Sequence, residues 1–283
     1  MKSHRSLNQF AVITAVVLSL ALASAGLAQQ GRSSGWGRAG GGCGWCDGGT
    51  NTLFSEIEKG TLSTDDIDGL RFMREEEKLA RDVYLTLAEK WQLPIFGNIA
   101  GAEQRHVDAV QMVFTTYEID DPEFDSAVGV FANSELADLY RQLVARGEKS
   151  VVDGLIVGAT IEDLDLNDLA VQLGSTENDH VKMIYNNLAK GSRNHLRAFI
   201  RTLSAQGGTY GPKHIEQETF DAILAAEMER RVVYGADGEI LASGGGNGRK
   251  GQGRGGNGRG YRGGAGSGNG KCGGGGQGVG LTG

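Results

Sequence analysis

Apolar residues recur every three or four positions along most of the middle of this chain, a period typical of helices that bury one face. Prolines fall only at 94, 122 and 212, and no stretch of the middle alternates well enough to predict a strand. Capping residues, helix breakers and the period together predict long helices at 65–91, 96–117, 151–173 and 177–205 and short ones at 134–145 and 215–230.

The connections between these helices indicate their arrangement. The first two long helices are joined closely across Pro94 and the last two across residues 174–176, whereas residues 118–150 make a long excursion between the second and the third. Two short connections and one long crossover are typical of one class of four-helix bundle. The sequence therefore predicts an all-α fold, a four-helix bundle with a crossover connection and additional short helices.

Each long helix carries an apolar stripe, spaced four and three residues apart, that would face the bundle interior. Ionisable residues interrupt all four stripes: Glu77, Glu103 with His106, Glu162, and His195. A buried carboxylate without a partner is costly, so it either takes up a proton or binds a cation. One or two divalent cations at the centre of the bundle would satisfy the five side chains together. A polar core of salt bridges or hydrogen bonds is the alternative.

Residue counts along the helices leave two questions open. The last long helix has a second Glu-x-x-His pair, Glu177 with His180, about 22–27 Å from His195 along the axis, and depth alone does not decide which histidine belongs to the site. Glu77 and Glu103 also differ in depth by about 12 Å if the turn at Pro94 is tight. The connection would then have to run extended and climb back along the bundle.

Other polar residues near the stripes receive simpler interpretations. Glu75 and Glu76 fall off the stripe and are expected to be solvated. Tyr84 and Tyr117 are expected to pack in the core, although a tight turn would make Tyr84 face Glu103 and leave Glu77 an ordinary acid at the core edge. Arg81 is either a partner of a site carboxylate or a surface residue.

Four segments resemble a known group of proteins. The sequence "EEEKLARDVY" has the order of glutamate, Ala-Arg and tyrosine found in rubrerythrin-type first helices, and "IAGAEQRHV" is similar to their second helix. "GATIEDLDL" and "GSRNHLRAF" resemble the third and fourth helices of a ferritin-like domain of unknown function in exported or membrane-associated bacterial and archaeal proteins. The resemblance covers about 65–225. It implies a ferritin-like bundle with metal ligands at Glu77, Glu103, His106, Glu162 and His195.

The chain departs from the full di-iron pattern at one ligand. That pattern has a second Glu-x-x-His on the fourth helix, but Ser192 stands three residues before His195. The missing carboxylate puts in doubt a second ion and any O₂ chemistry that needs two, and Asp165, one turn after Glu162, is a candidate substitute. Carboxylate and imidazole ligands suit iron, manganese or zinc and do not choose among them.

The two ends of the chain differ from the middle. Residues 1–28 are predicted to be a signal peptide, because a basic start, an apolar run and small residues suited to cleavage follow in order; an uncleaved anchor is the alternative. Residues 29–60 are predicted to be a Gly-rich linker containing Cys43 and Cys46, 61–235 the bundle, and 236–283 a disordered Gly/Arg/Asn-rich tail. The cysteine pair would form a disulfide, a redox motif or half of a metal site; a surface disulfide or a pair of unused thiols is the favoured interpretation, because redox motifs normally sit at a helix N-terminus.

Charge narrows the classes of partner. Residues 51–243 hold 18 basic and 34 acidic residues, a net charge of −16. Such a domain is a poor binder of nucleic acid and attracts cations. The prediction is an exported metal-binding protein, periplasmic, in the cell envelope or extracellular, which would oxidise Fe(II) with O₂ or peroxide if it is an enzyme. The alternative is a non-catalytic envelope protein that acts through its tails, and a homodimer stays open.

Overall fold

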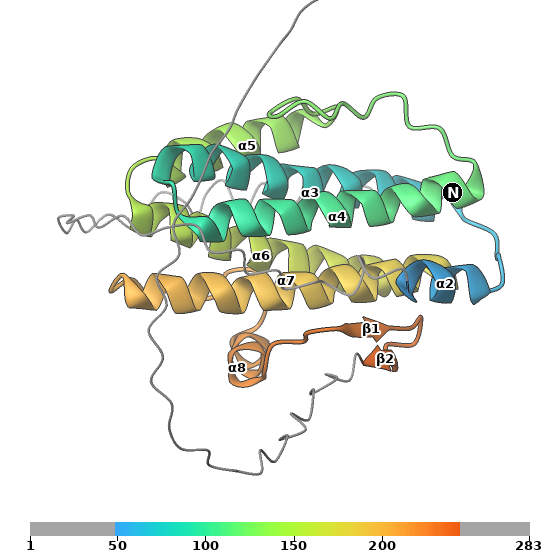
Figure 1. Ribbon diagram of the computed structural model, residues 1–283. Coiled ribbons are helices and arrows are strands. Elements are labelled where there is room, and N and C mark those ends of the chain that lie inside the picture. The colour runs from blue at the N-terminus through green and yellow to red at the C-terminus, as the bar shows by residue number, and fades with distance from the viewer. Residues whose placement is uncertain (1–48, 244–283) are drawn as a thin grey trace, which may run out of the picture. The chain divides into compact units, whose positions relative to one another are not determined.

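A computed structural model describes residues 49–243 of the chain (Figure 1). The predicted signal peptide, the two linker cysteines and most of the Gly-rich tail lie outside the described residues. The described part is predominantly helical, as the sequence predicts, with seven helices and two short strands. No helix among residues 49–243 combines the length and the apolar character needed to cross a membrane.

The helices follow one another in chain order with short connections, apart from one long segment. They are α2 (Gly49–Glu56), α3 (Thr64–Trp91), α4 (Pro94–Tyr117), α5 (Ser134–Gly147), α6 (Val151–Leu173), α7 (Asp179–Ala205) and α8 (Gln217–Ala225), followed by β1 (Val232–Tyr234) and β2 (Ile240–Ser243). The four predicted long helices are α3, α4, α6 and α7, each within two residues of the predicted bounds. Ser63 caps α3 in a capping box with Asp66.

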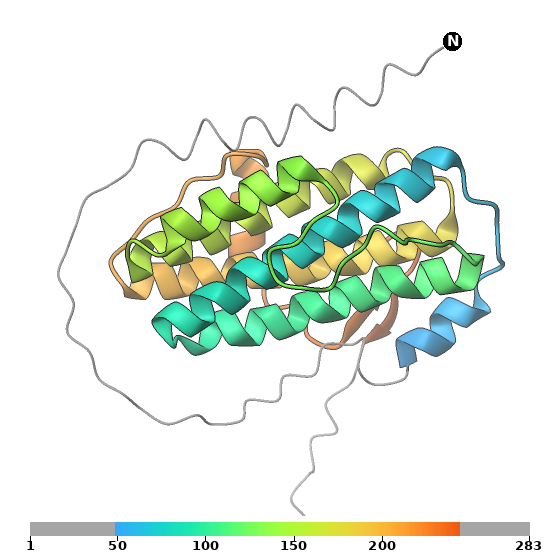
Figure 2. The same ribbon diagram turned by 90° about the horizontal axis from the view of Figure 1, so that it is seen from above.

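The four long helices lie side by side in two layers (Figures 1 and 2). One layer is the pair α3 and α4 and the other is the pair α6 and α7, while α3 also contacts α6 and α4 contacts α7. Only Gln92 and Leu93 separate α3 from α4, so these two helices run antiparallel. The short helix α5 packs on α3 and α6.

The apolar stripes meet in the interior between the two layers. Met73 of α3, Val110 of α4, Leu169 of α6 and Leu188 of α7 are all fully buried. Burial of a side chain of this size stabilises a fold by roughly 1.5–3 kcal/mol. The ionisable residues of the same stripes are carried into the same interior.

The segment between α4 and α5 crosses back over α3 (Figure 2) and is fastened there by a buried lysine. The ammonium of Lys78 donates to Asp82 at 2.6 Å and to the carbonyl oxygens of Ala127 and Val130 at 2.8 Å each. Lys78 and Asp82 are both 0% exposed. An irregular segment cannot satisfy its own carbonyl groups, so these bonds are what allow it to cover α3.

This covering buries acids and a cation that lie off the apolar stripe. Glu75 accepts hydrogen bonds from the backbone N–H groups of Ala132 and Asn133, at 2.7 and 2.9 Å. Arg81 is 6% exposed and donates to the carbonyl of Ser126. The prediction that Glu75 and Glu76 are solvated is wrong, because α3 is covered on more sides than one stripe implies.

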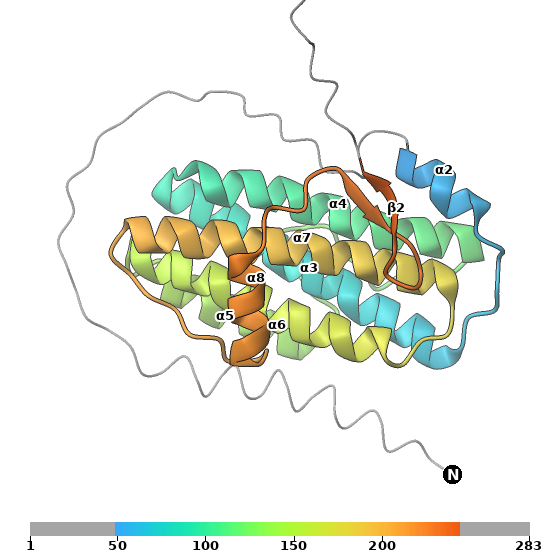
Figure 3. The ribbon, with the colours of Figure 1, turned by 90° about the horizontal axis from the view of Figure 1, so that it is seen from below.

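Ordered elements also occur where the sequence predicted none. Helix α2 lies within the stretch predicted as linker, and β1 and β2 form an antiparallel pair that reaches into the predicted tail. β1 lies against α7, and β2 pairs with β1 (Figure 3). The Asn187 amide exchanges hydrogen bonds with the backbone of Tyr234, and Lys190 donates to the carbonyl of Val232. The expectation of a purely helical middle is wrong here, because strands of three and four residues are too short to show alternation.

Candidate functional site

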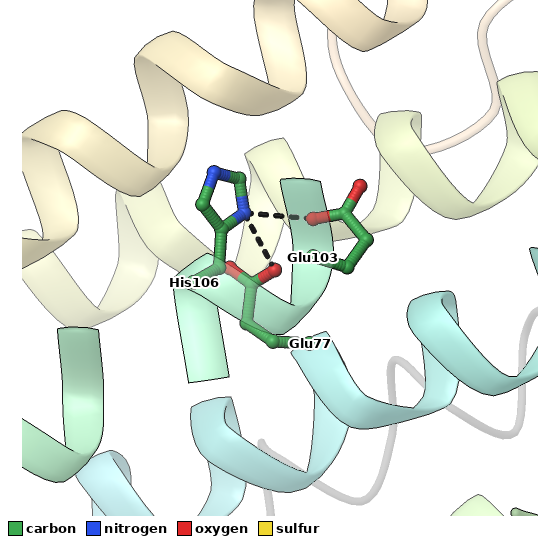
Figure 4. Close-up of side chains that lie close together, drawn as sticks. All are labelled: Glu77, Glu103 and His106. Carbon is green, nitrogen blue, oxygen red and sulfur yellow. Dashed lines mark hydrogen bonds and ion pairs between the residues drawn. The ribbon is translucent and has the colours of Figure 1, made fainter. Parts of the chain in front are cut away.

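The five predicted ligands come together between the layers, although they come from four helices. His106 Nδ1 lies 2.9 Å from Glu77 Oε2 and 2.7 Å from Glu103 Oε2 (Figure 4). His195 Nδ1 lies 2.7 Å from Glu103 Oε1 and 3.5 Å from Glu162 Oε2. We call these five residues the Glu/His cluster.

Glu103 joins the two halves of the Glu/His cluster. Its Oε2 faces His106 and its Oε1 faces His195. One group consists of Glu77, Glu103 and His106, and the other of Glu103, Glu162 and His195. In each group the ligand atoms lie within 4.8 Å of one another. The imidazole rings are stacked with centroids 5.5 Å apart. The arrangement could hold one ion in each group, with Glu103 common to both.

Several atoms of the cluster are buried without a hydrogen bond. Glu103 is 1% exposed, and Glu77 and Glu162 are 2% exposed each. Glu77 Oε1, Glu103 Oε1 and His195 Nδ1 have no hydrogen-bond partner among the described residues. Glu103 Oε1 and His195 Nδ1 approach to 2.7 Å, yet they are not aligned as donor and acceptor. Atoms so close and so oriented suit ligands of a common cation, and a buried unsatisfied group calls for such an explanation.

Burial and mutual charge set the protonation of the metal-free cluster. Burial raises the pKa of Glu77 to about 7 and that of Glu162 to about 7. Burial alone would lower the pKa of His195, but Glu103 and Glu162 raise it to about 10. Burial alone would also raise the pKa of Glu103, but His195 and His106 hold it well below its usual range. The cluster therefore retains protons at neutral pH, and an entering cation would displace them.

Two further residues shape the cluster. The hydroxyl of Tyr84 donates to Glu162 Oε1 at 2.6 Å, a polar role that sequence reasoning missed by treating this tyrosine as core packing. Its place on the α3 stripe, seven residues after Glu77, was the available signal. Gly191 of α7 faces the His106 ring so closely that an added Cβ would lie 2.4 Å from both Cε1 and Nε2. A glycine is needed there for the imidazole to occupy its position.

A second set of acids lies beside the cluster. Asp165 of α6 is 4% exposed and accepts a hydrogen bond from the hydroxyl of Ser192. Glu76 is 2% exposed, and neither of its carboxylate oxygens has a hydrogen-bond partner within residues 49–243. Burial, and then the charge of Asp168, raises the pKa of Glu76 well above its usual range. Sequence reasoning missed the burial of Glu76 because the stripe alone did not show it.

The other Glu-x-x-His pair of the chain, Glu177 with His180, lies around the start of α7 and does not join the cluster. His180 Nδ1 lies 2.9 Å from the hydroxyl of Tyr117, and its Nε2 lies 3.0 Å from the carbonyl oxygen of Phe54. Glu177 is exposed and pairs with Lys182. Of the two α7 histidines, His195 is the one that reaches the Glu/His cluster.

The turn between α3 and α4 is tight, yet Glu77 stays in the cluster. α3 ends 14 residues after Glu77, and α4 begins 12 residues before His106. These spans correspond to about 21 and 18 Å, so the two side chains lie at nearly the same depth. Glu103, one turn closer to the connection, reaches the same ring by its spacing of three residues. The expected extended climb of the connection is absent, and its alternative, Glu77 as a core-edge acid, is also wrong.

The fold and the cluster together define a class: a predominantly helical protein with a buried group of carboxylates and imidazoles that could hold a metal ion. Residues 66–227 match DUF2202, a family described as an uncharacterized protein domain. The chain belongs to this family. The matched range includes every residue of the Glu/His cluster.

A relative from the archaeon Methanocaldococcus jannaschii is similar to this chain. The uncharacterized protein MJ0754 is 50% identical over 176 residues, which cover 62% of this chain and 95% of the relative. The crystal structure titled hypothetical protein MJ0754 from Methanococcus jannaschii DSM 2661 matches with a TM-score of 0.60 and 49% identity. That match covers 62% of this chain and 99% of the crystallised one. The similarity supports the fold, and neither title assigns an activity.

Proposed function

We propose that this protein binds divalent metal ions within a ferritin-like four-helix bundle, with Glu77, Glu103, His106, Glu162 and His195 as ligands. The observation that carries the proposal is the meeting of five buried ionisable side chains from four helices, with ligand atoms that lack hydrogen bonds. The connection from α4 to α6 through α5 supports the crossover topology of that fold.

The ligand types fit iron and its neighbours. Carboxylate and imidazole ligands suit iron, manganese and zinc, and di-iron carboxylate proteins place Glu and Glu-x-x-His side chains on the helices of a bundle. Glu77 and His106 would hold one side of the site, Glu162 and His195 the other, and Glu103 would be shared. Iron is the first choice, with manganese and zinc as the other candidates.

Bound Fe(II) would supply electrons to O₂ or to a peroxide. Reduction of one hydrogen peroxide to two waters would take one electron from each of two Fe(II) ions and two protons. The chain's own residues handle protons and position. Glu77 and Glu162 would release protons when a cation enters, because burial raises the pKa of each to about 7 and leaves each partly protonated at neutral pH. The hydroxyl of Tyr84 fixes Glu162 Oε1, which leaves Oε2 facing His195.

We further propose that the protein works outside the cytoplasm, on the strength of the signal-like start of the sequence. The acidic charge of residues 51–243 supports metal ions, rather than nucleic acid, as the partners there. Sequencing the N-terminus of protein recovered from its natural cells tests this point. An intact Met1 in the cell interior would contradict it.

The experiment that tests metal binding is elemental analysis of the full chain purified without added metal, followed by anaerobic Fe(II) titration. We expect about one or two ions per chain, and loss of that binding in Glu103→Gln with the fold retained, because only Glu103 belongs to both groups. The matched control is Glu177→Gln, which alters the other Glu-x-x-His of the chain and should bind as the unmodified protein does.

One result would overturn the proposal. A folded, ion-free protein that does not respond to Fe(II), manganese or zinc would show that the Glu/His cluster is a polar core. That result would favour the alternative, a non-catalytic envelope protein that acts through its tails. Equal metal binding by Glu103→Gln and the unmodified protein would show that the ions bind elsewhere.

A further inference from the structure

α6 places a carboxylate beside the α7 position where the full di-iron pattern has one. Ser192 occupies the α7 position three residues before His195, and its hydroxyl donates to Asp165 Oδ2. Asp165 in turn lies three residues after Glu162, so the two acids share one face of α6. The structure thus has a Glu-x-x-Asp on α6 beside the Glu-x-x-His on α4.

The free oxygen of Asp165 has no ordinary partner. Asp165 is 4% exposed, and its Oδ1 is without a hydrogen bond in the described part of the chain. Burial, and then the charges of the cluster acids Glu77, Glu162 and Glu103, raise its pKa well above the usual range. A carboxylate among three others, with one oxygen unpaired and buried, needs a cation or a proton.

Asp165 lies outside the two tight groups that share Glu103. The Ser192 hydroxyl holds its Oδ2 and leaves Oδ1 as the oxygen open to an ion. A hydrogen bond of this kind fixes a ligating carboxylate in the way that outer partners orient ligands in metal sites.

The charges also match two ions better when Asp165 is counted. The five cluster residues carry three carboxylates and two imidazoles, a charge of −3 that neither one nor two divalent cations neutralise. With Asp165 the charge is −4, which two divalent cations balance with both imidazoles neutral. Residual charge in a buried site is costly.

We propose that Asp165 is the sixth ligand and that it gives the site two divalent cations, with Ser192 positioning its carboxylate. This inference rests on the proposed function. It places the sixth carboxylate on α6, where the full di-iron pattern has it on α7.

The test is the number of Mn(II) ions bound by the full chain at saturation, from equilibrium dialysis with elemental analysis. Mn(II) is the probe because carboxylates suit it and thiolates do not, so Cys43, Cys46 and Cys272 compete little. We expect about two ions per chain, falling to about one in Asp165→Asn, which keeps the size of the side chain and the bond to Ser192.

Two further variants make the result specific. The double variant Asp165→Ser with Ser192→Glu exchanges the two side chains' roles between helices and should return the count to about two ions per chain. Asp168→Asn is the matched control, since it removes a neighbouring buried acid of α6 that faces Glu76 and should leave the count unchanged. Circular dichroism confirms that each variant is folded.

The outcomes separate this inference from the proposed function. An unmodified protein and an Asp165→Asn variant that bind the same number of ions would overturn the role of Asp165 while metal binding stands. Failure of the double variant to regain an ion in a folded state would overturn the placement of the sixth carboxylate. A protein that binds no ion under any condition would overturn the proposed function itself.

Discussion

Gly191→Ala should damage metal binding although glycine offers no ligand atom. The new Cβ would lie 2.4 Å from His106 Cε1 and Nε2. Carbon atoms in contact settle at about 3.5–4.0 Å, so the ring or the helix must retreat by about 1 Å. The imidazole is rigid, and its Nδ1 would move with it, away from Glu77 and Glu103.

The size of the effect follows from the tolerance of metal sites. Ligand distances hold to within about 0.2 Å, so a shift of about 1 Å is several times too large. Loss of a group that orients a ligand commonly lowers metal affinity about 10–100-fold, and we expect at least that for Gly191→Ala. Overpacking costs about 1–3 kcal/mol, partly offset by the better helix propensity of alanine, about 1 kcal/mol.

The assay is a Mn(II) titration of the full chain by calorimetry, with thermal unfolding followed by circular dichroism. Each kcal/mol lost should lower the unfolding temperature by about 2–4 °C for a domain of this size. Gly97→Ala is the matched control, because Gly97 lies in α4 with no atom within 4 Å of an added Cβ. It should bind metal normally and unfold at a slightly higher temperature.

One result would refute this reasoning. If Gly191→Ala binds Mn(II) as tightly as the unmodified protein does, the position of His106 does not depend on the close approach of α7. The Glu/His cluster would then lack the preorganisation assigned to it.

Three other predictions test the cluster and its surroundings. The metal-free domain should lose thermal stability as pH rises from about 5 to 8. Glu77, Glu162 and His195 all have pKa values raised in the folded state, so the folded chain binds more protons than the unfolded one. Saturating Mn(II) should reverse this slope, and a stability that does not change with pH in the metal-free domain would contradict the prediction. Tyr84→Phe should lower metal affinity about 10–100-fold, because Glu162 loses the hydrogen bond that orients it. A Mn(II) titration measures this affinity, and an unchanged value would show that the hydrogen bond of 2.6 Å does not position Glu162 for metal binding. His180→Ala should lower the free energy of unfolding by about 2 kcal/mol or more, because two hydrogen bonds are lost. The number of ions bound should not change, and loss of an ion would place His180 in the metal site.

The long helices were predictable from sequence because they depend on local periodicity, and the interrupted stripes together with the ferritin-like resemblance indicated the five cluster residues. α6 has the predicted bounds, 151–173, since Ser150 caps its start and the spacing of four and three residues continues to its end. Each interrupted stripe fixes which face its ionisable residue occupies. Convergence then follows once the four stripes face one interior.

The burial of the neighbouring acids was not predictable in the same way. Glu75 lies off the stripe and becomes buried because the segment held by Lys78 covers it, with the backbone N–H groups of Ala132 and Asn133 donating to its carboxylate. That covering is a contact between residues about fifty positions apart, which a helical period does not encode. Glu77 lies at the depth of His106 and not at that of Glu103, so the mismatch of about 12 Å expected between Glu77 and Glu103 does not separate Glu77 from the cluster.

The short strands were missed for a related reason. β1 pairs with only three residues of β2, and its backbone accepts hydrogen bonds from side chains of α7 that lie more than forty positions away. Strand propensity in so short a stretch is weak compared with these tertiary bonds.

The lysine beneath the segment that crosses α3 offers a chemical reporter. An amine that is fully enclosed and holds three acceptors cannot react with acylating reagents while the segment stays closed. Its rate of modification, read by mass spectrometry of the peptide that contains Lys78, would therefore measure how often the segment lifts away. The chain thus carries its own probe of local opening above the helix that contributes Glu77.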